Sequence, residues 1–102
     1  MKEHKWINDD TDEFMLSVLE LDNLAEARAF LGDIFTKSEI QEAANRWKAA
    51  KMLTFGASYR KIERVTGMSS ATVSRIRKAM EEGSGGYGLM IGKLEQTAKR
   101  TC

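Results

Sequence analysis

The sequence contains no proline, a single cysteine and a single histidine among its 102 residues. Proline interrupts the hydrogen-bond ladder of a helix, so its absence leaves helices free to form almost anywhere in the chain. One cysteine, at the terminal position Cys102, excludes an internal disulfide and a cysteine-rich zinc site. No apolar run approaches the roughly 18–20 residues that cross a bilayer, and the first residues lack the apolar stretch of a secretion signal. We therefore expect a cytoplasmic protein with no membrane partner.

Side chains that could perform catalysis or bind a metal are few and scattered. His4 has no cysteine or carboxylate at ligand spacing, and Cys102 has no evident base that would activate its thiol. The acidic pairs 9–10 and 12–13 are typical of a helix N-terminus, where negative charge is favourable. The glycine-rich stretch 83–88 follows no expected strand and contains no lysine, so it does not match a phosphate-binding loop. The sequence predicts a protein that is not an enzyme, without a metal site or cofactor.

Charge is distributed unevenly along the chain, although the net charge is only +1. Residues 1–45 contain four Lys or Arg against eleven Asp or Glu, a net charge of −7. Residues 46–102 contain twelve against four, a net charge of +8, and within 46–80 the only acid is Glu63. Binding of a basic surface to a polyanion releases condensed counterions. The basic half is therefore typical of a nucleic-acid-binding face.

Capping signals and apolar spacing predict an all-α fold of five to six helices. The first helix begins at Asp10 or Thr11, with Phe14, Val18 and Leu21 at helical spacing. The second follows Asn23 and places one apolar stripe along its length: Leu24, Ala27, Leu31, Ile34 and Phe35. Apolar residues cover much of the first helix, more than a chain this short can bury by itself. We therefore expect a dimer.

The start of the third helix has the clearest local signal in the sequence. Thr36 and Glu39 have the spacing of a capping box, in which each side chain accepts a hydrogen bond from the other residue's backbone N–H. The helix is expected to continue to about Thr54 with this buried face: Ile40, Ala43, Ala44, Trp47, Ala50 and Leu53. Residues 1–82 are expected to form one helical domain. Residues 83–102 are expected to follow it as a glycine-rich linker, over 83–88, and a weak last helix.

Residues 58–80 have the pattern of a helix-turn-helix. Ser58 is a cap for a short helix, and Gly67 stands where a two-helix corner requires a positive φ. Ser69 or Ser70 then caps a second helix. The residues expected to point inward are the apolar positions of both helices: Tyr59, Ile62 and Val65 from the first, and Val73, Ile76 and Met80 from the second.

The outward face of this motif is small and polar at the start of the second helix and basic around it. Small side chains allow a helix to enter the major groove, hydroxyls can bond to base edges, and cations can contact phosphates. The residues that we expect to contact double-stranded DNA are Ser58, Arg60, Lys61, Arg64, Ser69, Ser70, Ala71, Thr72, Ser74, Arg75 and Lys78. The alternatives are a helical interaction module, such as an antitoxin-like adaptor with a basic face, and a head that binds DNA only within a larger assembly.

Residues 35–80 resemble the core of the tryptophan repressor family, particularly its TrpR-related YerC/YecD branch. The resemblance rests on the helix start at Thr36 and Glu39, on Arg46, on the Gly67 corner and on residues 71–75, Ala-Thr-Val-Ser-Arg. It implies an intertwined all-α homodimer whose two helix-turn-helix heads enter successive major grooves. It also implies a sequence-specific transcriptional regulator, with repression the expected direction. The operator and the regulated genes do not follow from the sequence.

The resemblance further implies a small-molecule pocket formed by Thr36, Arg46 and Arg75, since the family's two arginines hold the tryptophan corepressor. Two positions depart from the pattern. Ile76 stands where tryptophan-binding members have a glycine, and Ala79 stands where they have a serine. Ile76 would fill the space that the indole ring needs, so we expect no tryptophan corepressor. Whether another effector binds is left open by the sequence.

Overall fold

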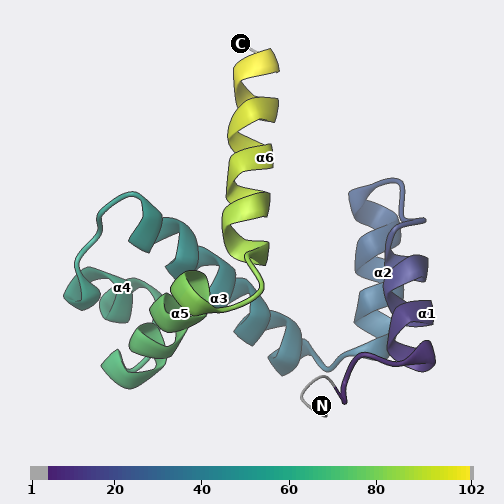
Figure 1. The fold of residues 1–102 in the computed structure, drawn as a ribbon, viewed down its shortest axis with the longest axis horizontal. Helices are drawn as coiled ribbons and strands as arrows, with labels where there is room; N and C mark the ends of the chain where they lie inside the picture. The colour runs from purple at the N-terminus through teal and green to yellow at the C-terminus, as the bar shows by residue number, and fades with distance from the viewer. Residues whose placement is uncertain (1–4, 102) are drawn as a thin grey trace. The chain divides into compact units, whose positions relative to one another are not determined.

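A computed structural model describes residues 5–101 and consists of helices joined by short loops (Figure 1). The elements of this described part are α1 (Asp9–Val18), α2 (Leu24–Ile34), α3 (Lys37–Thr54), α4 (Tyr59–Thr66), α5 (Ser70–Glu82) and α6 (Gly86–Thr101). The predicted all-α fold is confirmed. None of the helices in this part of the chain has the length and apolarity of a membrane span. Contacts divide the chain into an N-terminal unit, residues 1–40, and a C-terminal unit, residues 41–102.

In the N-terminal unit, α1 and α2 form a helical hairpin that local caps define. Asn8 accepts the Thr11 N–H at 3.0 Å, and the Asn8 N–H donates to Thr11 Oγ1 at 2.9 Å, so α1 begins at Asp9. Asn23 caps α2 by accepting the Glu26 N–H at 2.9 Å. The ring of Phe14 lies 6.2 Å from that of Phe30 and 6.1 Å from that of Phe35. These aromatic contacts join the two helices.

The N-terminal unit buries none of its described residues fully. Of the stripe expected along α2, Leu24 is 64% exposed and Ile34 is 49% exposed, whereas Phe30, which was not part of that stripe, faces inward. The reason is that two helices alone cover only one narrow face of each other. The exposed large apolar residues of this unit are Trp6, Ile7, Met15, Leu16, Leu19, Leu24, Ile34, Phe35 and Ile40.

In the C-terminal unit, the last turns of α3 pack with α4 and α5 around a small core. The capping box predicted for α3 is present at the start of this helix, in the part that belongs to the N-terminal unit: Thr36 Oγ1 accepts the Glu39 N–H at 3.0 Å and Glu39 Oε1 accepts the Thr36 N–H at 2.9 Å. The core consists of Ala49, Ala50, Ile62, Val73 and Ile76, each at most 2% exposed. Two of these come from each of α3 and α5, so the core fixes the rotation of both helices about their axes.

Two expectations for buried faces are wrong in part. On α3, Ile40, Ala43 and Ala44 are exposed, because the other helices of the C-terminal unit pack only against its later turns. On α4, Ile62 lies at the centre of the face that packs on the core. Val65 lies at the edge of that face and is 46% exposed. Trp47 is half-buried, and its ring stacks on that of Tyr87 with a centroid separation of 6.4 Å.

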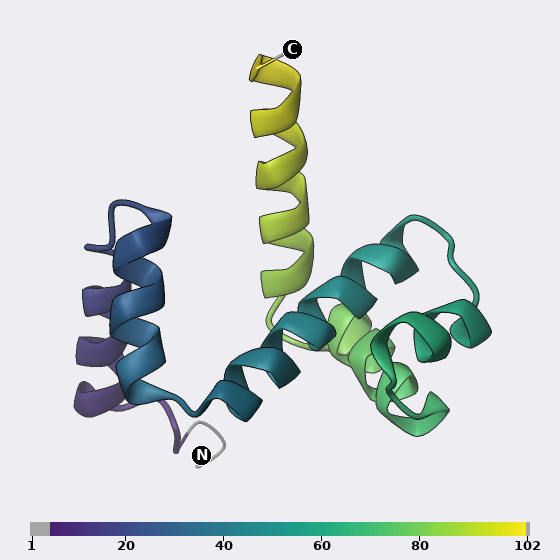
Figure 2. The same ribbon diagram turned by 180° about the vertical axis from the view of Figure 1, so that it is seen from behind.

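The last helix begins earlier than the sequence suggested. A flexible stretch was expected over residues 83–88, but α6 starts at Gly86, and Gly85 adopts a φ of +85° and accepts the Leu89 N–H at 3.0 Å. Ile91 is 6% exposed, while Leu89, Met90 and Leu94 are exposed. In both ribbon views the later turns of α6 extend beyond α3–α5 of the same unit (Figures 1 and 2).

Candidate nucleic-acid interface

The helix-turn-helix has the caps and the corner that the sequence predicted. Ser58 Oγ accepts the Lys61 N–H at 3.1 Å and starts α4. Gly67 ends α4 with a φ of +76°, and its N–H donates to the Glu63 carbonyl at 2.8 Å. Only glycine adopts this left-handed conformation at little cost. The direction change between α4 and α5 is therefore set by one residue type at one position.

The turn after Gly67 is held by side-chain hydrogen bonds. Thr66 Oγ1 donates to the Ile62 carbonyl at 2.7 Å and accepts the Met68 N–H at 3.2 Å. Ser69 is the cap of α5, since its Oγ accepts the Thr72 N–H at 3.2 Å. The sequence left Ser69 and Ser70 as alternatives, and the structure selects Ser69.

Burial of one face of α5 determines which side chains face outward. Val73 and Ile76 are fully or almost fully buried and Met80 packs on the core, as predicted from their spacing. The residues expected to contact DNA are exposed, apart from Thr72, which is half-buried: Ser58, Arg60, Lys61, Arg64, Ser69, Ser70, Ala71, Ser74, Arg75 and Lys78. They come from α4, α5 and the caps of the two helices. Their role on DNA stays a prediction.

Some cations on α3–α5 make ion pairs with a carboxylate, and others do not. Arg46 on α3 donates to Glu42 Oε2 at 2.9 Å, and Arg77 on α5 donates to Glu81 Oε2 at 3.2 Å. Hydrogen bonding and charge from Glu81, and then Tyr59, raise the pKa of Arg77 above its ordinary value. Within residues 5–101, the expected phosphate-contacting cations make no such ion pair: Arg60, Lys61, Arg64, Arg75 and Lys78. These five charges are available to a polyanion.

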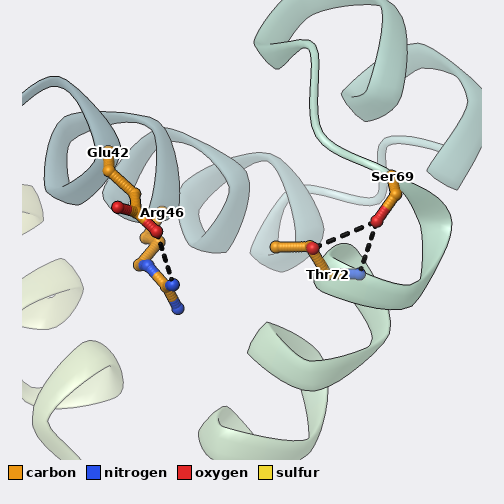
Figure 3. A network of polar contacts seen from close by, with 4 residues as sticks. All are labelled: Glu42, Arg46, Ser69 and Thr72. Carbon is orange, nitrogen blue, oxygen red and sulfur yellow. Dashed lines mark hydrogen bonds and ion pairs between the residues drawn. The ribbon is translucent and has the colours of Figure 1, made fainter. Parts of the chain in front are cut away.

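The three residues of the suggested small-molecule pocket each occupy a different setting. Thr36 caps α3, Arg46 is hydrogen-bonded to Glu42 (Figure 3), and Arg75 is exposed on α5. Ile76, beside Arg75, is 2% exposed and belongs to the core. A hollow of about 450 Å³ does lie in the C-terminal unit, but its lining includes neither arginine and consists of Trp47, Ala79, Gly83, Ser84, Gly85, Gly86, Tyr87 and Met90.

Other candidate groups contribute nothing further to this site. His4 and Cys102, for which no metal or catalytic role is expected, lie outside the described residues. In the described part of the chain, no three His, Cys, Asp or Glu side chains gather in a way that could hold a metal ion. One feature of α5 was not predicted from the sequence. Ser69 and Thr72 were both candidates, but their hydroxyls are in direct contact, a possibility that the cap-to-third-residue spacing could have indicated.

Known proteins resemble this chain in sequence, and two solved structures resemble it in fold. The sequence model of the Trp repressor protein family matches residues 9–95. The uncharacterized protein YerC of Bacillus subtilis (strain 168) is 37% identical over 86 residues, which cover 84% of this chain and 83% of YerC. A TrpR-like protein from Eubacterium eligens has a crystal structure that superposes with a TM-score of 0.87 at 31% identity, covering 91% of this chain and 96% of that one. A crystal structure of a candidate Trp repressor from Staphylococcus aureus gives 0.86 at 32% identity, covering 93% and 95%.

Proposed function

The chain belongs to the Trp repressor family, a family of DNA-binding regulators, and we propose that it is a repressor that recognises a specific DNA sequence as a homodimer, without tryptophan as corepressor. The observation that carries the proposal is the outward face of the helix-turn-helix. Small and hydroxyl side chains occupy the first turn of α5, and five exposed cations that make no ion pair within residues 5–101 lie on α4 and α5. A helix start of this kind fits the major groove, and the cations match the phosphates on either side.

The two parts of this face are expected to respond differently to substitution. Thr72→Ala is expected to weaken binding to the preferred site by about 1–3 kcal/mol with little change on bulk DNA, because Thr72 lies at the start of α5. Lys78→Ala is expected to weaken binding to both DNAs about equally and to flatten the dependence of log affinity on log salt by about one, because one phosphate contact is lost. Competition titrations at several salt concentrations measure both effects.

Two results would contradict this assignment. Equal losses on preferred and bulk DNA for Thr72→Ala would show that α5 does not recognise bases. A parent protein with no salt-dependent affinity for DNA would contradict DNA binding itself and would favour the adaptor alternative. The preferred site for these titrations comes from selection on random DNA by the parent protein.

The N-terminal unit supports the homodimer. Its described residues are all at least partly exposed, and nine large apolar side chains on it are exposed to solvent. Exposed large apolar side chains in this number are typical of a protein that buries them against a partner. The apolar residues Leu89, Met90 and Leu94 on α6 add a further uncovered surface. A second copy of the chain is the commonest partner for such a surface in soluble proteins.

Core packing supports independence from tryptophan. Ile76 is 2% exposed and fills the space between α3, α4 and α5, while Arg46 is engaged by Glu42. An indole ring at this position would have to displace a packed core side chain. We therefore expect no binding of L-tryptophan below millimolar concentration and no effect of tryptophan on DNA affinity. Calorimetry and operator titrations with and without tryptophan measure this, and a micromolar dissociation constant would contradict it.

A further inference from the structure

The start of α6 lies beside α3 in both ribbon views, and an aromatic contact joins the two helices (Figures 1 and 2). The ring of Tyr87, in the first turn of α6, stacks on the ring of Trp47 with a centroid separation of 6.4 Å and an angle of 9° between the ring planes. The Lys51 ammonium lies 5.3 Å from the centre of the same Trp47 ring. Stacked rings and a cation over an indole are both favourable. The Trp47 ring is therefore held both by α6 and by the next turn of α3.

Few other side chains attach α6 to the rest of the C-terminal unit. Among residues 86–97, only Tyr87 and Ile91 are not exposed, and they lie one turn apart on the same side of the helix. Tyr87 also packs against the core of this unit. The hollow of about 450 Å³ has both stacked rings in its lining, so other side chains do not fill the space beside them. Tyr87 is thus one of two side chains that fix the position of α6.

A short connection links this contact to the end of α5. Only residues 83–85 separate the last residue of α5 from the first residue of α6. The Gly83 N–H donates to the Ala79 carbonyl at 2.9 Å, and a Cβ at Gly83 would collide with that carbonyl oxygen. Gly85 has a φ of +85°. Because the connection is short and tightly turned, the position of Tyr87 constrains the C-terminal end of α5.

We propose that Tyr87 is a positioning residue for DNA recognition, because its stack on Trp47 fixes the tilt of the helix-turn-helix relative to α3. The inference rests on the proposed function, since it assumes a homodimer whose two helix-turn-helices bind two half-sites. The residues that α3 contributes to the buried core are Ala49 and Ala50, whose side chains are the smallest in it. A contact this small permits some tilt, and a second contact beyond the end of α5 restricts it. The spacing of the two recognition helices must match that of the half-sites, so a fixed tilt favours the preferred site.

The test removes the stack with Tyr87→Ala and keeps the ring in the matched variant Tyr87→Phe. Tyr87→Ala is expected to weaken binding to the preferred site by about two- to tenfold, the factor that corresponds to the free energy of one aromatic pair. Its binding to bulk DNA is expected to change by less than about twofold, because phosphate contacts without base recognition tolerate a tilted helix-turn-helix. Tyr87→Phe is expected to bind both DNAs as the parent does.

A double-mutant cycle and the fluorescence of Trp47 test whether the effect acts through the stack. Trp47→Leu is expected to weaken binding to the preferred site, and adding Tyr87→Ala to it is expected to cause no further loss, since the contact is already absent. In a Trp6→Phe background Trp47 is the only indole of the chain. There Tyr87→Ala is expected to shift the emission to longer wavelength as the indole becomes more exposed to water, and Tyr87→Phe is expected to leave it unchanged.

The possible failures are distinguishable. Equal losses on preferred and bulk DNA, no loss on either, or additive losses in the double variant would each show that the stack does not position the helix-turn-helix. A changed mass of Tyr87→Ala by light scattering would also contradict the inference, because the loss would then act through assembly. If circular dichroism shows that Tyr87→Ala is unfolded, Tyr87→Leu takes its place, since it removes the ring and keeps an apolar side chain. A parent protein that binds no DNA contradicts the proposed function itself.

Discussion

Leu16→Asp is expected to dissociate the protein into monomers and to reduce its DNA affinity. Leu16 lies on α1 and is 62% exposed in the single chain, among other uncovered apolar residues. A second copy that covers this surface would bury two Leu16 side chains, each worth about 1.5 kcal/mol or more. Losing both would weaken the dimer by about 3 kcal/mol, roughly a hundredfold in its dissociation constant, before the cost of two buried carboxylates is counted.

Light scattering and thermal melts at several protein concentrations measure this result. The parent is expected to have a dimeric mass and a melting temperature that rises with concentration, since dissociation is coupled to unfolding. Leu16→Met is the matched control, because it keeps an apolar side chain of similar volume and is expected to cost less than about 1.5 kcal/mol. A parent that is monomeric at micromolar concentration with a concentration-independent melt would exclude the homodimer. A dimeric mass for both the parent and Leu16→Asp would show that Leu16 lies outside the dimer interface.

Ile76→Ala is expected to lower the free energy of unfolding by about 2–5 kcal/mol. Ile76 is 2% exposed and packs in the core of the C-terminal unit, so truncation leaves a cavity that its neighbours fill only in part. Because α5 carries both Ile76 and the outward face, the variant is also expected to bind DNA more weakly. Urea denaturation at a fixed protein concentration measures the change in stability.

Val65→Ala is the control for this second prediction. Val65 is also an apolar residue of the helix-turn-helix, but it is 46% exposed, so its truncation is expected to cost no more than about 0.5 kcal/mol. Equal losses for Ile76→Ala and Val65→Ala would contradict the packing described for the head. A small loss for Ile76→Ala would also remove the physical reason for expecting independence from tryptophan.

The sequence determined the helix-turn-helix almost completely, because its signals are local. Ser58 can cap only the residues that follow it, Gly67 permits a positive φ where it stands, and the spacing of Val73 and Ile76 places them on one face of one helix. The capping box at Thr36 and Glu39 is local in the same way. Each of these features depends on atoms within a few residues of one another. Because these two residues face the core, the residues on the opposite side of α5 must face outward.

The tertiary structure decided which apolar faces have a neighbour to cover them. Helical spacing marks Ile34, Ala44 and Val65 as apolar positions, but it does not say where another helix will lie, and all three are exposed. Burial of these positions depends on chain segments that are far apart in the sequence. Local signals do not say which of those segments lie close together in the folded chain.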